Sequence, residues 1–176
     1  APDATGIEKV VSADEIVQIL WLAYRFNEPF GIFRSASINL NQWSGWDFGG
    51  NHQVLGVNLN GHAEFKNLWH ARFYVDTDSE AHSNSALRGG PTLILPGSFS
   101  TSLSVSTSSR KKLEGEIDVA YSNGYDDSGN RYGLALGLTY RPISNLNLSI
   151  YPEYSQRQSV LQYMEQQEID NESRYI

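Results

Sequence analysis

The sequence predicts an all-β protein, an antiparallel meander of about eight or nine long strands that forms a β-barrel. From residue 31 onward, apolar and polar residues alternate with period two over segments of about ten residues. Turn-forming residues separate these segments at short intervals, as in a chain of hairpins. No apolar run approaches the roughly 20 residues that a membrane-spanning helix needs.

Composition narrows the classes of protein that this chain can belong to. Its 176 residues suit one domain. Lysine and arginine total 13 against 20 aspartates and glutamates, a formal charge of -7, so nucleic acid is not an expected partner. The chain has no cysteine, which excludes disulfides and thiolate metal sites and is compatible with export.

We expect residues 1–25 to be a lead-in segment of unclear origin and residues 26–176 to form one β-barrel domain. Ser12 with Glu15 fits a capping box, while residues 16–26 also fit a buried strand. We favour a short lead-in followed by a strand. Alternation then becomes clear at residues 38–41, where isoleucine and leucine share one face and two asparagines the other.

The next segments continue the alternation in order. Residues 55–65 place amide, imidazole and carboxylate groups opposite apolar ones, and residues 68–77 do the same after a tight turn at Lys66 and Asn67. Residues 79–91 have the composition of a loop. Alternation resumes at residue 98, where every even-numbered residue up to 106 is serine. Further strands are expected near 114–121 and 132–140, with a last pair over 146–154 and about 160–168.

Period two alone does not say which face of the strands meets water, because soluble barrels bury the apolar face and membrane barrels expose it to lipid. Here the polar face is rich in serine, glycine and asparagine, which suits a wet lumen. Aromatic residues also gather near strand ends, as at Trp43, Trp46, Tyr121 and Tyr132. Girdles at the two interfaces of a membrane have this pattern.

Several motifs resemble those of a known family. They occupy residues 33–35, 39–50, 57–62, 65–67 and 87–91, and weaker likeness continues through 154–155, 161–163 and 174–176. Together they resemble an uncharacterised family of Gram-negative, Bacteroidota-type outer-membrane proteins. Members of that family pair an amino-terminal domain like a carbohydrate-binding module with a carboxy-terminal β-barrel. This chain looks like a fragment of the barrel part.

The resemblance implies a location in the cell outer membrane and a non-enzymatic role in surface carbohydrate handling or solute passage; the alternative location is secreted or periplasmic. The implied partners are outer-membrane lipid or detergent and a carbohydrate. An incomplete barrel would also leave open sheet edges, through which a homodimer would form. No cofactor is expected.

Two alternatives come from other classes of protein. In a small soluble glycoside hydrolase, carboxylates spaced at about 6.5 to 7 Å along one face of a strand would act as general acid and base. The candidates are Glu114, Glu116, Asp118 and Glu64. In a soluble ligand-binding barrel, the apolar residues would instead point inward around a ligand.

Candidate ligand-binding residues form two groups. One would form a sugar-stacking platform, since aromatic rings beside amides and carboxylates suit carbohydrates; it comprises Trp43, Trp46, Asp47 and Asn51. The other shares one face of a predicted hairpin with Glu64 and comprises His62, His70 and Arg72. We interpret this second group as a satisfied polar cluster in preference to a metal site, and no metal is expected.

Overall fold

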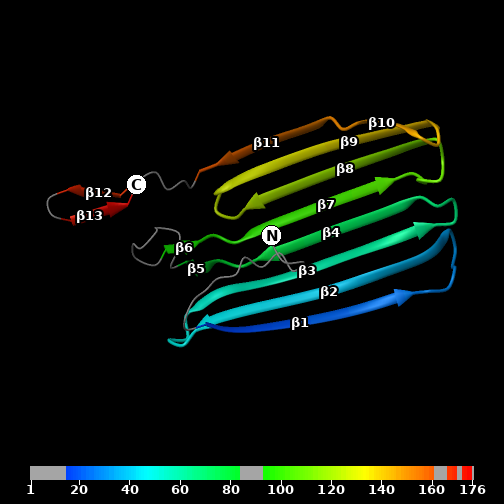
Figure 1. Ribbon diagram of the computed structural model, residues 1–176. Helices are drawn as coiled ribbons and strands as arrows, with labels where there is room; N and C mark the ends of the chain where they lie inside the picture. Colours follow the sequence, from blue (N-terminus) through cyan, green and yellow to red (C-terminus); the bar gives the residue numbers. More distant parts are fainter. Residues whose placement is uncertain (1–14, 84–92, 161–165, 170–171, 176) are drawn as a thin grey trace.

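The computed structural model describes residues 15–83 and 93–160, together with the backbone of residues 166–169 and 172–175 (Figure 1). Its strands are β1 (Glu15–Phe26), β2 (Phe33–Asp47), β3 (His52–Phe65), β4 (His70–Asp78), β5 (Ala81–Ser83), β6 (Leu93–Leu95), β7 (Ser98–Ser106), β8 (Leu113–Gly124), β9 (Gly129–Ile143), β10 (Leu146–Ile150), β11 (Glu153–Ser159), β12 (Gln166–Ile169) and β13 (Glu172–Tyr175). No helix in this part of the chain is long and apolar enough to cross a membrane.

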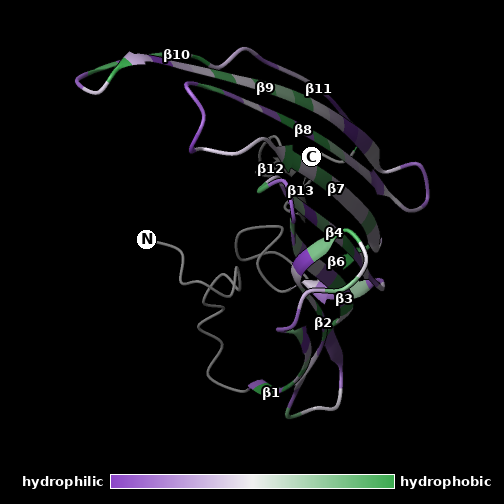
Figure 2. Cartoon of the chain, turned by 90° about the vertical axis from the view of Figure 1, so that its right-hand side faces the viewer, coloured by the Kyte–Doolittle hydropathy of each residue, from purple (hydrophilic) through white to green (hydrophobic). Residues whose placement is uncertain are grey.

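Nine of the strands form one antiparallel sheet. They follow the order β1-β2-β3-β4-β7-β8-β9, and β10 and β11 both pair with the far side of β9. The connection from β4 to β7 carries the small β5–β6 hairpin, and β12 pairs only with β13. The predicted all-β antiparallel meander is therefore confirmed. The sheet bows into an arc, and its open edges within the described residues are β1 on one side and β10 with β11 on the other (Figure 2).

The first strand confirms that residues 16–26 are extended. β1 pairs with β2 along its whole length, from Glu15 opposite Asp47 to Phe26 opposite Ala36. Its sequence is apolar on both faces, which explains why period two was not visible there. Residues 15–25 of the segment expected to be a lead-in are thus all part of the sheet.

The expected strand over 146–154 is divided into two strands, while residues 161–165 of its expected partner over 160–168 lie outside the described residues and residues 166–169 form β12, which pairs with β13. β10 pairs with residues 138–143 of β9, and β11 pairs with residues 129–135. Tyr151 and Pro152 interrupt the edge between them, because proline has no N–H to donate to the ladder. The carbonyl of Pro152 still accepts a hydrogen bond from the Leu136 N–H, at 3.0 Å. The interrupted edge therefore remains aligned along β9.

Short turns set the register of the hairpins. Between β8 and β9, Asp126 and Asp127 both adopt φ of 55°, a left-handed conformation that aspartate tolerates better than most residues. Between β3 and β4, Leu68 adopts φ of 65° in the turn predicted at Lys66 and Asn67. Because each turn fixes the pairing of its two strands, the polar residues of successive strands meet on one face.

Hydrophobic and hydrophilic residues alternate along the strands, seen as green and purple bands in Figure 2, so the sheet has two chemically different faces. No hydrophobic residue is buried among those the structure describes. Buried positions are polar instead, including Ser37, Asn58 and Thr139. On the other side, side chains such as Leu103, Leu136 and Ile117 are 43–52 % exposed. We call these sides the polar face and the apolar face.

Candidate functional site

The polar face collects the chemistry-bearing residues of six consecutive strands, because the antiparallel register aligns their polar positions in rows. One row runs from Asn41 on β2 through Asn58 and Asp76 to Ser100, Ser122 and Arg131 on β9. The next row runs Asn39, Asn60, Tyr74, Ser102, Ala120 and Gly133. The predicted serine row and the predicted carboxylate row both lie on this face.

Four asparagines of β2 and β3 form a hydrogen-bonded ladder. Asn39 donates to the Asn60 side chain at 2.9 Å, and Asn41 donates to Asn58 Oδ1 at 2.8 Å. Asn60 also donates to Asn58 Oδ1, at 2.5 Å. Asn58 in turn donates to the Val75 carbonyl on β4 at 3.0 Å. Asn58 is therefore the residue that links three strands, and only 4 % of it is exposed.

Replacing Asn58 by alanine is expected to lower the free energy of unfolding by about 1–3 kcal/mol, because two amide donors and one carbonyl lose their partner. Urea unfolding followed by tryptophan fluorescence measures this change. Asn39→Ala is the matched control, since Asn39 makes one bond at the end of the ladder. Equal losses from the two variants would show that Asn58 does not have this linking role.

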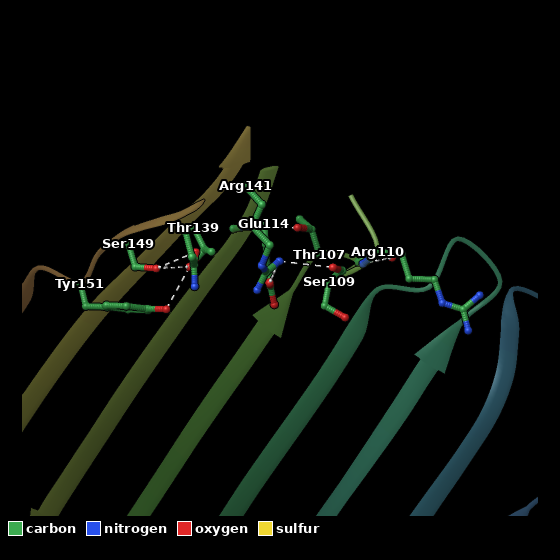
Figure 3. A network of polar contacts seen from close by, with 11 residues as sticks. Thr107, Ser109, Arg110, Glu114, Thr139, Arg141, Ser149 and Tyr151 are labelled. Atoms are coloured by element: carbon green, nitrogen blue, oxygen red, sulfur yellow. Dashed lines mark hydrogen bonds and ion pairs between the residues drawn. The ribbon is translucent and has the colours of Figure 1, made fainter. Parts of the chain in front are cut away.

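Three arginines on the polar side of the sheet are paired with glutamates. Arg34 contacts Glu64 at 2.7 Å, Arg141 contacts Glu114 at 2.9 Å, and Arg72 contacts Glu116 at 3.5 Å. Figure 3 shows the Arg141 pair at the end of β8 and β9, where Arg141 also donates to the Ser109 carbonyl at 3.3 Å. Beside it, the buried Thr139 hydroxyl lies 3.0 Å from both Ser149 and Tyr151. All three glutamates are thus placed by ion pairs.

A groove of about 460 Å³ crosses the polar face from β4 to β11. Small side chains line much of it: Ser100, Ser102, Ser104, Ala120, Gly133 and Ala135. The larger polar groups in its lining are Tyr74, Asp118, Arg131 and Glu153. Because Ala135 pairs with both Asp118 and Glu153, these two carboxylates stand on strands about 10 Å apart with only a methyl group between them.

The four carboxylates predicted for catalysis share the polar face but do not form one cluster. Glu64 and Glu116 occupy the same row three strands apart, with His70 and Ser106 between them, a separation of about 14 Å between backbones. Glu64, Glu114 and Glu116 each contact an arginine. Asp118 is the member of the set that lines the groove. The hydrolase assignment of these residues stays a prediction.

The histidine group lies on one face of the β3–β4 hairpin, as expected. His62 is opposite Arg72, and Glu64 is opposite His70. His62 Nδ1 lies 3.0 Å from the Ser37 hydroxyl, so this ring has a hydrogen-bond partner. Among the described residues, no group of three or more histidine, aspartate or glutamate side chains is placed to hold a metal ion.

The tryptophan group is divided between the two faces. Trp43 is opposite Gly56 on the polar face, whereas Trp46 is opposite Ile16 on the apolar face. Alternation along a strand places residues three positions apart on opposite faces, so the period of two already separates the two rings. The expected platform is therefore not assembled from both rings.

Asp47 and Asn51 bind each other in the turn between β2 and β3. The Asn51 backbone and side-chain amides donate to the Asp47 carboxylate at 2.7 and 2.8 Å. The side-chain hydrogen bond from Asn51, followed by its backbone hydrogen bond, holds the pKa of Asp47 below its usual range. Both residues therefore have a role in the turn itself.

Sequence reasoning missed three groove residues, Tyr74, Arg131 and Glu153. The period of two does place Arg131 on the same face as Gly133, which is the signal that was available. The period of two does not give the cross-strand register, and it is this register that brings the three residues to the same groove from β4, β9 and β11.

Fold and site together define a class of protein, an antiparallel meander sheet with one polar, grooved face and one exposed apolar face. The chain belongs to the family described as a domain of unknown function, DUF5916, whose model matches residues 6–176. The match includes β1 as well as the later strands. No curated protein and no solved structure matches the chain.

Proposed function

We propose that this chain forms part of the wall of an outer-membrane-type β-barrel, with the apolar face against lipid and the polar face lining a water-filled lumen. The observation that carries the proposal is the uncovered apolar face, combined with the absence of any buried hydrophobic residue in the described part of the chain. Soluble monomers seldom expose apolar patches above a few hundred Å². A bilayer covers such a face without any further protein layer.

Strand length supports the proposal. A tilted strand needs about 9–11 residues to cross the hydrocarbon core. β3, β8 and β9 have 14, 12 and 15 residues, and β4 and β7 have nine each. The strands in the middle of the sheet are thus long enough to span, and several extend beyond the hydrocarbon.

Aromatic rings near both ends of the strands also support the proposal of a membrane barrel. At the end where β1 meets β2, consecutive ring centroids are 4.7–5.2 Å apart through Tyr24, Phe26, Phe30, Phe33 and Phe65. Toward the opposite end, Tyr121 and Tyr132 pair across β8 and β9 at 5.0 Å on the apolar face. Aromatic residues prefer the two interfaces of a membrane.

The role we assign to this barrel is solute passage or surface carbohydrate handling. The groove supports it, since serines, a tyrosine, carboxylates and an arginine offer hydrogen bonds to a polar solute such as a sugar. The open edges, at β1 on one side and at β10 and β11 on the other, would need pairing in a membrane, by further strands of a barrel or by a second copy of this chain. A soluble ligand-binding barrel is less well supported, because the grooved face here is polar.

Single cysteines on neighbouring residues test the orientation of the two faces, and the natural chain contains no cysteine to interfere. Ser102→Cys lies on the polar face of β7 and Leu103→Cys on the apolar face. After reconstitution into vesicles, a water-soluble maleimide is expected to label position 102 and to leave position 103 unlabelled. Equal labelling of both positions would overturn the proposal.

The need for detergent is a second test of the membrane proposal. Circular dichroism and light scattering are expected to report a folded, monodisperse protein in micelles and an aggregated one in buffer alone. A compact monomer without detergent would instead favour a soluble protein. Glu116→Gln would then test the glycoside hydrolase alternative, which requires a loss of turnover with the fold intact.

A further inference from the structure

Two arginines face each other at the edge of the sheet. Arg131 on β9 is directly opposite Arg157 on β11, and Ser122 on β8 is opposite Arg131 on its other side. Directly opposed residues of an antiparallel pair have Cβ atoms about 4.5–5.5 Å apart, and like charges at this distance are destabilising. Both side chains are exposed on the polar face. The two like charges therefore destabilise this edge of the sheet unless an anion neutralises them.

Neither arginine has a carboxylate partner among the described residues. The ion pairs there involve Arg34, Arg72 and Arg141. The polar-face positions beside and opposite the two arginines are uncharged: Ser122, Gly129, Gly133, Ser155 and Ser159. This concentration of positive charge occurs in a chain whose formal charge is -7. Two positive charges are thus held together with no carboxylate partner among the residues that the structure describes.

A second hollow, of about 330 Å³, lies at these arginines. Its lining is polar or glycine throughout: Ser122, Gly124, Ser128, Gly129, Asn130, Arg131, Arg157, Gln158 and Ser159. Serine hydroxyls and side-chain amides are hydrogen-bond donors, and guanidinium groups bind oxyanions with two parallel N–H bonds. The hollow therefore combines space, donors and charge of one sign.

We propose that Arg131 and Arg157 form a binding site for an oxyanion, the carboxylate, phosphate or sulfate group of a ligand on the polar face. The anion would lie between the two guanidinium groups and remove their repulsion. This inference is independent of the membrane proposal, because it depends only on the register of β9 and β11 and on the hollow beside them. A barrel lined in this way would prefer acidic solutes over neutral ones at this point of its lumen.

Inorganic phosphate tests the site directly. The thermal midpoint of the full chain, held in a neutral, phosphate-free detergent, is measured in sodium phosphate and in sodium chloride of equal ionic strength. Phosphate is expected to raise the midpoint, since a ligand that binds only the folded state stabilises it. Arg157→Gln and Arg131→Gln are each expected to bind phosphate at least tenfold more weakly. Without the anion, both variants should melt no lower than the natural chain, because the repulsion is gone.

Arg25→Gln is the matched control, since it removes the same charge from β1 at the other edge of the sheet and should keep the full response to phosphate. Vesicles of neutral and of anionic phospholipid distinguish a lipid headgroup from a free solute as the source of the oxyanion. A rise in the thermal midpoint with either source of oxyanion, if Arg157→Gln reduces that rise, supports the site. The same rise in all three variants, or no rise with either source, would overturn the proposed oxyanion site.

Discussion

Replacing Leu136 by arginine is expected to lower the free energy of unfolding in a bilayer by about 2–4 kcal/mol, or roughly 30- to 700-fold in the folding equilibrium. Leu136 is the central residue of β9, and 44 % of its side chain is exposed on the apolar face. If that face lies in hydrocarbon, the new guanidinium must leave water near the midplane of the membrane. Urea titration of the chain in vesicles measures the change.

The neighbouring residue provides the control for this prediction. Ala135→Arg introduces the same side chain one position away on the same strand, but on the polar face, where Asp118 and Glu153 flank Ala135. Its cost is expected to be below about 1 kcal/mol, because the charge stays in water beside two carboxylates. Similar losses from both variants would contradict the assignment of the apolar face to lipid.

This contrast between adjacent residues was accessible from the sequence, since alternation along a strand follows from backbone geometry alone. The faces of β3, β4, β7, β8 and β9 are those that the period of two predicts. β1 was harder to assign because it is apolar on both sides. Local pattern therefore predicted most of the sheet, and it missed the division of the last strand into β10 and β11, which depends on pairing along β9.

The candidate site was less predictable, because it depends on register across strands. Arg131 and Arg157 are 26 positions apart in the chain, yet they lie directly opposite each other on β9 and β11. The interruption at Pro152 produces this pairing by letting β10 and β11 share β9 as a partner. No one-dimensional pattern contains that information.

The role of one glycine on the polar face illustrates the same dependence on register. Gly56 on β3 lies between Trp43 on β2 and Asp78 on β4. The Trp43 indole and the Asp78 carboxylate occupy the space where a side chain at position 56 would begin. A glycine at position 56 thus allows a contact between two strands that are not neighbours in the sheet.

Gly56→Ala is therefore expected to lower the free energy of unfolding by about 1–3 kcal/mol, the usual cost of overpacking, and to shift the tryptophan emission as the Trp43 ring moves. Gly133→Ala is the matched control on the same face. A Cβ there would meet only the Ala120 Cβ at 3.7 Å, an ordinary contact. Because glycine weakens a strand interior, this control should be neutral or stabilise by about 0.5–1 kcal/mol. If both substitutions have the same effect, the contact over Gly56 does not contribute to stability, and the packing of Trp43 against Asp78 is incidental.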